Sequence, residues 1–137
     1  MATVPMVEVR SRFDIDDEEL SRLHDIAFGT PSKVLPWADR VRRYSVTWVG
    51  AFDGDALVGF AHAVWDGGSH AFLLDTSVHP DYQHREIGAC LVSRLIDDVR
   101  AAGCDWLHVD YEPHLRPFYE EACGFRPTDA GLIELKS

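Results

Sequence analysis

The sequence is poor in cysteine and has no long apolar run, and each absence excludes a class of protein. Its three cysteines are odd in number and widely spaced, which matches neither a disulfide framework nor a zinc site. We therefore expect a reducing compartment and a cytoplasmic location. Apolar runs such as 71–74 fall far short of the ~20 residues that span a bilayer, and residues 1–13 lack the pattern of a signal peptide. No membrane partner is expected.

Basic side chains are also scarce. The chain has 13 Lys and Arg against 23 Asp and Glu, which gives a formal charge of −10. A negative field repels the phosphates of nucleic acid, so no nucleic-acid partner is expected, and the same field weakly favours a cationic substrate such as an amine. The 137 residues contain no repeat, low-complexity tract or linker. We therefore expect residues 1–137 to form a single domain around one core.

What the chain does contain is a regular succession of apolar patterns. Runs rich in β-branched and aromatic residues predict strands at 7–10, 45–52, 56–65, 71–78, 106–111 and 132–135. Apolar residues at three- to four-residue spacing predict helices at 16–27, 36–44, 87–102 and 115–123. This order predicts an α/β (α+β) fold, in which a mixed, largely antiparallel central sheet is flanked by helices.

The junction between the strand at 71–78 and the helix at 87–102 is where we expect an anion to bind. The first turn of a helix leaves N–H groups unpaired, and the helix dipole adds positive potential there. Gly88 and Ala89 have little or no side chain, so a ligand could approach the backbone closely. His84 and Arg85 add positive charge. Taken alone, the pattern also fits an ordinary helix start.

Residues 78–89, Val-His-Pro-Asp-Tyr-Gln-His-Arg-Glu-Ile-Gly-Ala, resemble the acyl-CoA signature of the GNAT superfamily of N-acetyltransferases. In that signature a strand ending in Val-x-Pro is followed by Arg/Gln-x-x-Gly-x-Gly/Ala. A second block at 117–125, Pro-Phe-Tyr-Glu-Glu-Ala-Cys-Gly-Phe, is similar to the family's Phe/Leu-Tyr-x-x-x-Gly-Phe block, with one extra residue before the glycine. The two blocks occur in the family's order, and the resemblance covers essentially the whole chain.

The resemblance implies the substrates and a set of cofactor contacts. It implies acetyl-CoA as the donor, no metal, and a primary amine on a small molecule, peptide or protein as the acceptor. The residues expected to contact the cofactor are Thr76, Val78, Gln83, His84, Arg85, Glu86, Ile87, Gly88, Ala89 and Phe118. The chain departs from the family at Glu86, where the signature has glycine, and at Glu112, where many relatives have asparagine.

The resemblance also implies direct attack of the amine on the thioester, which needs an acid, a base and an oxyanion donor. Tyr119 matches the family's tyrosine, which is proposed to protonate the departing thiolate. Asp75 interrupts an apolar strand, and burial there would raise its pKa and suit it to act as the base, directly or through water. Asp110 is the competing carboxylate, with Glu112 behind it. A main-chain N–H at or near Val78 is the expected oxyanion donor.

The acceptor side of the site is less defined. Asp110 and Trp37 are the candidate substrate contacts, and Trp37 belongs to the region 30–44, which shapes the acceptor pocket in relatives of this fold. The tryptophans are otherwise typical core or rim residues. The seven histidines show no metal-ligand spacing, and we expect most of them on the surface or on strand faces.

Two other classes of function stay open at this point. Because Glu86 places a carboxylate beside the expected diphosphate, the chain could be a catalytically silent sensor that binds acyl-CoA without turnover. It could also be a protein-interaction module that uses the exposed edge of its sheet. Pairing of two copies through such an edge would give a homodimer.

Overall fold

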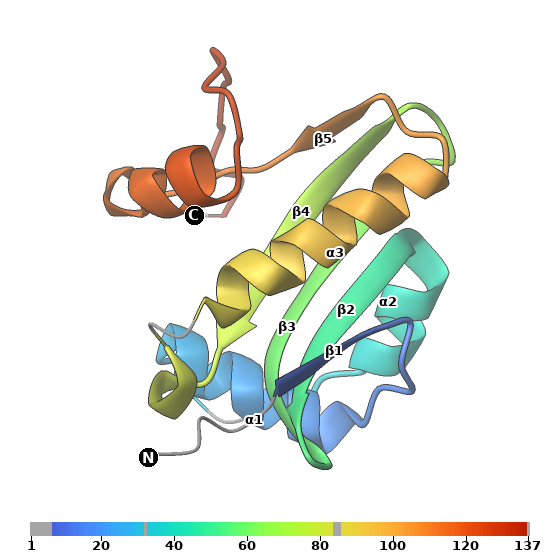
Figure 1. Cartoon of the computed structure of the whole chain (residues 1–137), viewed down its shortest axis with the longest axis vertical. Helices are drawn as coiled ribbons and strands as arrows, with labels where there is room; N and C mark the ends of the chain where they lie inside the picture. Colours follow the sequence, from blue (N-terminus) through green and yellow to red (C-terminus); the bar gives the residue numbers. More distant parts are fainter. Residues whose placement is uncertain (1–6, 32, 84–85, 137) are drawn as a thin grey trace.

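The computed structural model describes residues 7–31, 33–83 and 86–136 (Figure 1). Its elements, in chain order, are β1 (Val7–Ser11), α1 (Asp17–Phe28), α2 (Trp37–Tyr44), β2 (Ser45–Asp53), β3 (Ala56–Trp65), β4 (His70–Val78), the 3₁₀ turn η1 (Pro80–Tyr82), α3 (Ile87–Ala101), β5 (Trp106–His108), the 3₁₀ turn η2 (Pro113–Leu115) and the π-helical segment η3 (Pro117–Ala122).

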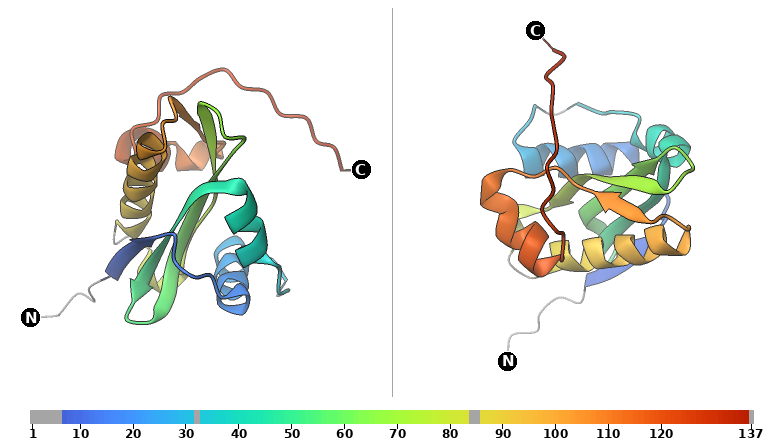
Figure 2. Two further views of the ribbon diagram at one scale, coloured as in Figure 1. Left: turned by 90° about the vertical axis from the view of Figure 1, so that its right-hand side faces the viewer. Right: turned by 90° about the horizontal axis from the view of Figure 1, so that it is seen from above.

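The five strands form one open sheet in the order of the sequence. β1 to β4 are antiparallel neighbours, and β5 pairs with β4 in parallel because α3 carries the chain back along the sheet. α3 covers one face of the sheet, and α1 and α2 cover the other (Figure 2). The predicted mixed, largely antiparallel fold flanked by helices is confirmed.

Local signals account for where the N-terminal helix begins and ends. The carboxylate of Asp16 accepts a hydrogen bond from the N–H of Glu19 at 3.0 Å and caps the first turn of α1. Gly29 ends α1 in the left-handed conformation, with φ 67°. Between these caps, Leu20 and Leu23 are buried, whereas Ile26, which the apolar spacing places on the same stripe, is 50% exposed.

Each face of the sheet has its own apolar core. The α3 side buries one stripe of that helix, which includes Leu91 and Leu95, against the sheet. The opposite side packs α1 and α2 against β2 and β3, with Trp37 and Phe60 as its largest fully buried side chains. Successive residues of a strand point to opposite faces, so a residue's position in β3 or β4 decides which layer its side chain reaches.

A β-bulge in β4 interrupts this alternation. Phe60 of β3 pairs with Ser77 and His62 pairs with Leu74, so two β4 residues, Asp75 and Thr76, lie opposite one residue of β3. Asp75 has φ 58°, in the left-handed region, and the Ser77 hydroxyl donates to its carbonyl at 2.9 Å. In a regular strand the Asp75 side chain would face α3; the bulge turns it to the α1 side.

The pairing of β4 with β5 is short, and the two strands then separate. Their parallel register runs only from His70 and Trp106 to Phe72 and His108. The strand predicted at 106–111 therefore ends at His108, because beyond Phe72 the bulge bends β4 away and β5 loses its hydrogen-bonding partner. The result is a splay between the second half of β4 and the segment after β5.

The strand predicted at 132–135 is wrong. Leu132, Ile133 and Leu135 are 88%, 81% and 93% exposed, and the segment extends away from the sheet (Figure 2). Alternating apolar residues favour a strand only where a neighbouring strand supplies hydrogen bonds, and the described part of the chain offers none at this position.

The helix predicted at 115–123 forms as two shorter pieces, and the second has π-helical geometry. The N–H of Cys123 bonds to the carbonyl of Phe118, five residues back, at 3.0 Å. A π turn accommodates one more residue than an α turn. The chain therefore absorbs its extra residue before Gly124 within this turn, and Gly124 ends it with φ 85°.

Candidate active site

Three features gather where β4 and β5 separate. They are the first turn of α3, the Tyr119 side chain from η3, and a chain of polar side chains centred on Asp75 in the β4 bulge. The first two lie on the α3 side of the sheet and the third lies on the α1 side.

The start of α3 is where the sequence predicts an anion site. Glu86 precedes the helix with φ 61°, and its side chain makes no capping hydrogen bond among the described residues. The first main-chain bond at this end runs from the N–H of Cys90 to the carbonyl of Glu86, at 3.1 Å. The N–H groups of Ile87, Gly88 and Ala89 therefore precede the intrahelical ladder, as the sequence predicts. His84 and Arg85, the expected basic contacts, lie outside the described residues.

Gly88 has a role that differs from the one expected of it. A β-carbon built on Gly88 would lie 3.0 Å from Cε1 of Phe118 and 3.8 Å from a methyl of Val78. The space left by the absent side chain is therefore filled by Phe118, and the expectation that this space admits a ligand is wrong. The close contact holds η3 against the first turn of α3. Any ligand of the Gly88 N–H must approach from another direction.

Gln83 and Val78 meet at the end of β4. The Gln83 side-chain amide donates to the Val78 carbonyl at 3.3 Å, and Val78 lies opposite Gly59 of β3. Two of the predicted cofactor contacts are thus brought together beside the splay. The contact fixes the turn that leads from β4 toward α3.

Tyr119 is enclosed by other aromatic rings. It is 8% exposed, stacks on Tyr111 with ring centroids 5.1 Å apart, and meets Phe118 edge-on at 4.8 Å. Burial raises the pKa of the Tyr119 phenol, and the hydrogen bond with the Thr76 side chain offsets part of that rise. The phenol is therefore protonated at neutral pH, and its role as a proton donor stays a prediction. Thr76 belongs to the β4 bulge, which ties Tyr119 to the splay.

Asp75 lies at the centre of a polar chain on the other face. Its Oδ2 is 2.7 Å from Nε2 of His62, and its Oδ1 is 3.1 Å from Nε2 of His24. Nδ1 of His62 is 2.9 Å from the hydroxyl of Ser45. Burial pushes the pKa of Asp75 up, but the hydrogen bonds and charges of His62 and His24 together outweigh it, so the net pKa is lowered. The raised pKa expected of Asp75 is wrong.

The two histidines are the part of the site that sequence reasoning missed. His62 is 4% exposed and sits within an otherwise apolar strand, and His24 lies on the inner side of α1. The signal for His62 was a single polar residue in the apolar run of β3. This strand forms a hairpin with β4, the strand that carries Asp75. No local signal pointed to His24, which is 51 residues from Asp75 in the sequence.

The two candidate substrate contacts fall in different settings. Trp37 is 1% exposed and packs on His24, with ring centroids 5.0 Å apart, so the structure gives it a packing role in place of an open substrate contact. The helix pattern explains this, because Trp37 and Val41 form the buried face of α2. Asp110 is exposed in the segment that follows β5. A substrate contact by Asp110 stays a prediction.

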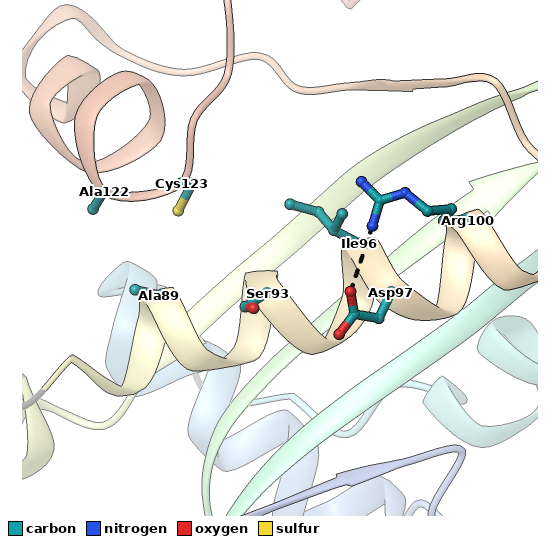
Figure 3. Close-up of a pocket in the computed structure, with 7 residues that line it drawn as sticks. All are labelled: Ala89, Ser93, Ile96, Asp97, Arg100, Ala122 and Cys123. Carbon is teal, nitrogen blue, oxygen red and sulfur yellow. Dashed lines mark ion pairs between the residues drawn. The ribbon is translucent and has the colours of Figure 1, made fainter.

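A shallow pocket of about 270 Å³ lies between α3 and η3 (Figure 3). Its described lining residues are Ala89, Ser93, Ile96, Asp97, Arg100, Ala122 and Cys123. The Arg100 guanidinium is 3.5 Å from the Asp97 carboxylate, so the basic group in this lining is already paired. The pocket runs along α3 from its first turn and is separate from the polar chain at Asp75.

The profile of the Acetyltransferase (GNAT) family matches residues 12–125 of this chain, which include both motif blocks and every element from α1 to η3. The chain belongs to the GNAT family of acetyltransferases. It is 35% identical over 65 residues to an uncharacterized N-acetyltransferase, ycf52, of Pyropia yezoensis, a stretch that is 47% of this chain and 37% of that protein. The ycf52 protein of Gracilaria tenuistipitata var. liui is 30% identical over 64 residues, or 35% of its length. The matched stretch thus spans little more than a third of these relatives.

Solved structures share the fold of this GNAT protein. A probable acetyltransferase from meticillin-resistant Staphylococcus aureus superposes with a TM-score of 0.78 at 21% identity, over 96% of this chain and 100% of that one. An acetyltransferase from Trypanosoma brucei gives a TM-score of 0.79 at 23% identity, over 94% and 99% of the two chains. The aminoglycoside N-acetyltransferase AAC(6')-Iy, solved in complex with CoA, gives 0.76 at 18% identity, over 99% and 98%.

Two absences among the described residues bear on the site. No helix in the ranges 7–31, 33–83 and 86–136 combines the length and the apolar character needed to cross a membrane. Within the same ranges, no group of three or more His, Cys, Asp or Glu side chains is arranged to hold a metal ion. In the Asp75 chain, both Nε2 atoms face the carboxylate oxygens, so they do not converge on a common point.

Proposed function

We propose that this GNAT protein transfers the acetyl group of acetyl-CoA to a primary amine by direct attack. The observation that carries the proposal is Tyr119, a buried phenol enclosed by Tyr111 and Phe118 beside the splay of β4 and β5. The uncapped start of α3 beside it suits a diphosphate. Ile87, Gly88 and Ala89 would hold that diphosphate through their N–H groups, with Gln83 and Phe118 shaping the approach.

Each step uses groups of this chain. A carboxylate or imidazole on the α1 side, or a water held there, takes the proton of the incoming ammonium, which frees its nitrogen to attack the thioester carbon. A main-chain N–H at or near Val78 donates to the oxygen that becomes negative. Tyr119 then donates its proton to the sulfur as the carbon–sulfur bond breaks. The nitrogen releases its second proton to solvent on collapse of the intermediate, and the phenolate takes up a proton from solvent, so the enzyme ends as it began.

The direct test measures coenzyme A release from acetyl-CoA across a panel of kanamycin, spermidine, glucosamine 6-phosphate and a lysine-containing peptide. Tyr119→Phe removes only the hydroxyl and should lower kcat about 10²-fold or more while the affinity for acetyl-CoA stays the same. Tyr44→Phe is the matched control, because Tyr44 is 58% exposed on α2. Turnover by Tyr119→Phe that equals the wild type at every pH would show that this phenol is not the acid.

A catalytically silent acyl-CoA sensor is the second candidate, and Glu86 favours it. This exposed carboxylate stands at the mouth of the proposed diphosphate site, where the family signature has glycine. Calorimetry separates the two functions. Binding of acetyl-CoA without turnover on any amine of the panel would favour the sensor, and turnover would favour the enzyme.

A further inference from the structure

We propose that His24 is the group that takes the proton from the incoming ammonium, and that Asp75 is the positioning residue that orients and stabilises it. The inference rests on the acetyl transfer proposed above. It moves the base from Asp75, where the sequence places it, to an imidazole on α1. Three observations support it: the hydrogen-bond pattern of the polar chain, its place in the bulge, and the packing around His24.

The hydrogen-bond pattern assigns the tautomers. The Asp75 carboxylate only accepts, so Nε2 of both His24 and His62 must carry a hydrogen. Nδ1 of a neutral His62 then accepts from the Ser45 hydroxyl, which satisfies that ring completely. Nδ1 of His24 has no partner among the described residues. Its lone pair is therefore available, and a carboxylate behind the ring stabilises the imidazolium that forms when it takes a proton.

The carboxylate itself is poorly suited to be the base. Asp75 has both oxygens engaged by donors, and the resulting net lowering of its pKa weakens its hold on a proton. His62 is 4% exposed and tied to Ser45, so it cannot reach a substrate. The His24 side chain is 19% exposed, which leaves it accessible from the α1 side.

The packing around His24 fixes the ring and defines its charged surroundings. The ring lies between Phe28 and Trp37, with centroids 4.5 Å and 5.0 Å away. Asp75 faces it from β4, and the Arg40 guanidinium of α2 lies over the Trp37 ring, 4.3 Å from its centroid. The Trp37 Nε1 atom is buried and has no hydrogen-bond partner in the described part of the chain. This side of the sheet thus has an unpaired donor next to His24, which a water or an acceptor oxygen could satisfy.

The bulge places acid and base on opposite faces of one strand. Asp75 points to His24 on the α1 side, and its neighbour Thr76 holds Tyr119 on the α3 side. An amine that enters from the α1 side gives its proton to Nδ1 of His24, and its nitrogen bonds to the thioester carbon. The carbon–sulfur bond breaks on the other side, where Tyr119 protonates the sulfur. His24 then passes its proton to water, and the nitrogen releases its second proton to solvent as the tetrahedral intermediate collapses. That second proton balances the one that the Tyr119 phenolate takes up, so protons and charge balance.

The kinetic test compares variants over a range of pH, with the amine of the panel that turns over fastest. His24→Gln should lower kcat/KM about 10²-fold or more at pH 7. The loss should shrink near pH 10, where about half of an alkylamine is already unprotonated. Asp75→Asn should keep part of the activity, because it disturbs the orientation of His24 and leaves the imidazole in place. A uniform loss at every pH in His24→Gln would mean a structural role and would overturn the proposal.

The control and the second readout separate this inference from the proposed function. His70→Gln replaces an exposed histidine that pairs with His108 at the far end of β4, so kcat/KM should not change. Nitrogen-15 NMR of the wild type should show the hydrogen of the neutral His24 ring on Nε2. A hydrogen on Nδ1 of His24 would overturn the proposal even if the enzyme is active. No turnover by the wild type on any amine would refute the proposed function instead, whatever the tautomer.

Discussion

At Glu86 both the backbone conformation and the family signature favour glycine. Glu86 has φ 61°, in a region where a side chain costs about 1–2 kcal/mol and glycine costs nothing. Glycine also gives the unfolded chain more conformational freedom, which offsets about 0.5–1 kcal/mol of that gain. Glu86→Gly should therefore stabilise the fold by about 0.5–1 kcal/mol. For a chain of 137 residues this corresponds to a rise in Tm of roughly 2–4 °C.

The same substitution should tighten binding of coenzyme A. If the diphosphate lies about 8 Å from the carboxylate, each pair of charges repels by about 0.5 kcal/mol at the dielectric constant of water. Two phosphate charges then give about 1 kcal/mol, or roughly fivefold in Kd. At about 0.15 M salt the Debye length is about 8 Å, so the gain should fall to about twofold. Calorimetry with coenzyme A at low and at physiological salt measures both values.

Two control variants separate the charge from the backbone. Glu86→Gln removes the charge and keeps the side chain, so it should improve Kd as much as glycine does and leave Tm unchanged. Glu86→Ala should behave in the same way for binding. If neither glycine nor glutamine changes Kd at low salt, the diphosphate does not sit at this helix start. A lower Tm for Glu86→Gly would contradict the steric reasoning.

Three further predictions concern other parts of the molecule. Asp75→Asn should lower the free energy of unfolding by about 1–3 kcal/mol at pH 7, because two buried donors lose a charged acceptor. Since the pKa of Asp75 is lowered in the fold, the difference in unfolding free energy between wild type and variant should be present above about pH 4 and vanish at lower pH. Urea titrations at a series of pH values measure this difference. Burial raises the pKa of the Cys123 thiol to about 11, so iodoacetamide at pH 8 should alkylate exposed Cys90 well before Cys123. Equal alkylation rates of the two thiols, measured by mass spectrometry, would refute this. Deleting the exposed Glu121 should give a folded protein at least as stable as the wild type, because the π turn can close as an α turn. A product that circular dichroism shows to be molten would contradict the assignment of the extra residue to the π turn.

Elements with strong local patterns could be predicted from the sequence. β3 has the predicted bounds, 56–65, and α3 starts at the predicted Ile87, because apolar spacing and turn residues determine both locally. The strand expected at 132–135 failed because pattern alone cannot supply a pairing partner. The extra residue in the second motif block was visible in the sequence, but its accommodation as a π turn depends on hydrogen-bond geometry that no residue type dictates.

The faces that the β4 residues of the candidate site reach could not be predicted from the sequence, for one physical reason. Simple alternation from Ala71 and Leu73, which face α3, would point Thr76 and Val78 to the α1 side, yet both reach the α3 side; Tyr119 lies in a block whose spacing can be read along the chain. Asp75 is displaced in the opposite sense, because the bulge with its left-handed φ adds one residue to β4 and so exchanges the faces of the residues from Asp75 onward. A strand without the bulge would point Asp75 at the α3 layer, unpaired and buried.

The bulge thus accounts for several features at once. It separates β4 from β5, which opens the splay, and it presents consecutive residues to opposite layers. It also explains why Asp75 tolerates a left-handed conformation, since two histidines and the Ser77 hydroxyl hold it there. In the proposed mechanism acid and base act on opposite sides of one thioester, and one irregular step in one strand would place Tyr119 and His24 on those sides. That mechanism would also give the left-handed conformation of Asp75 a functional reason.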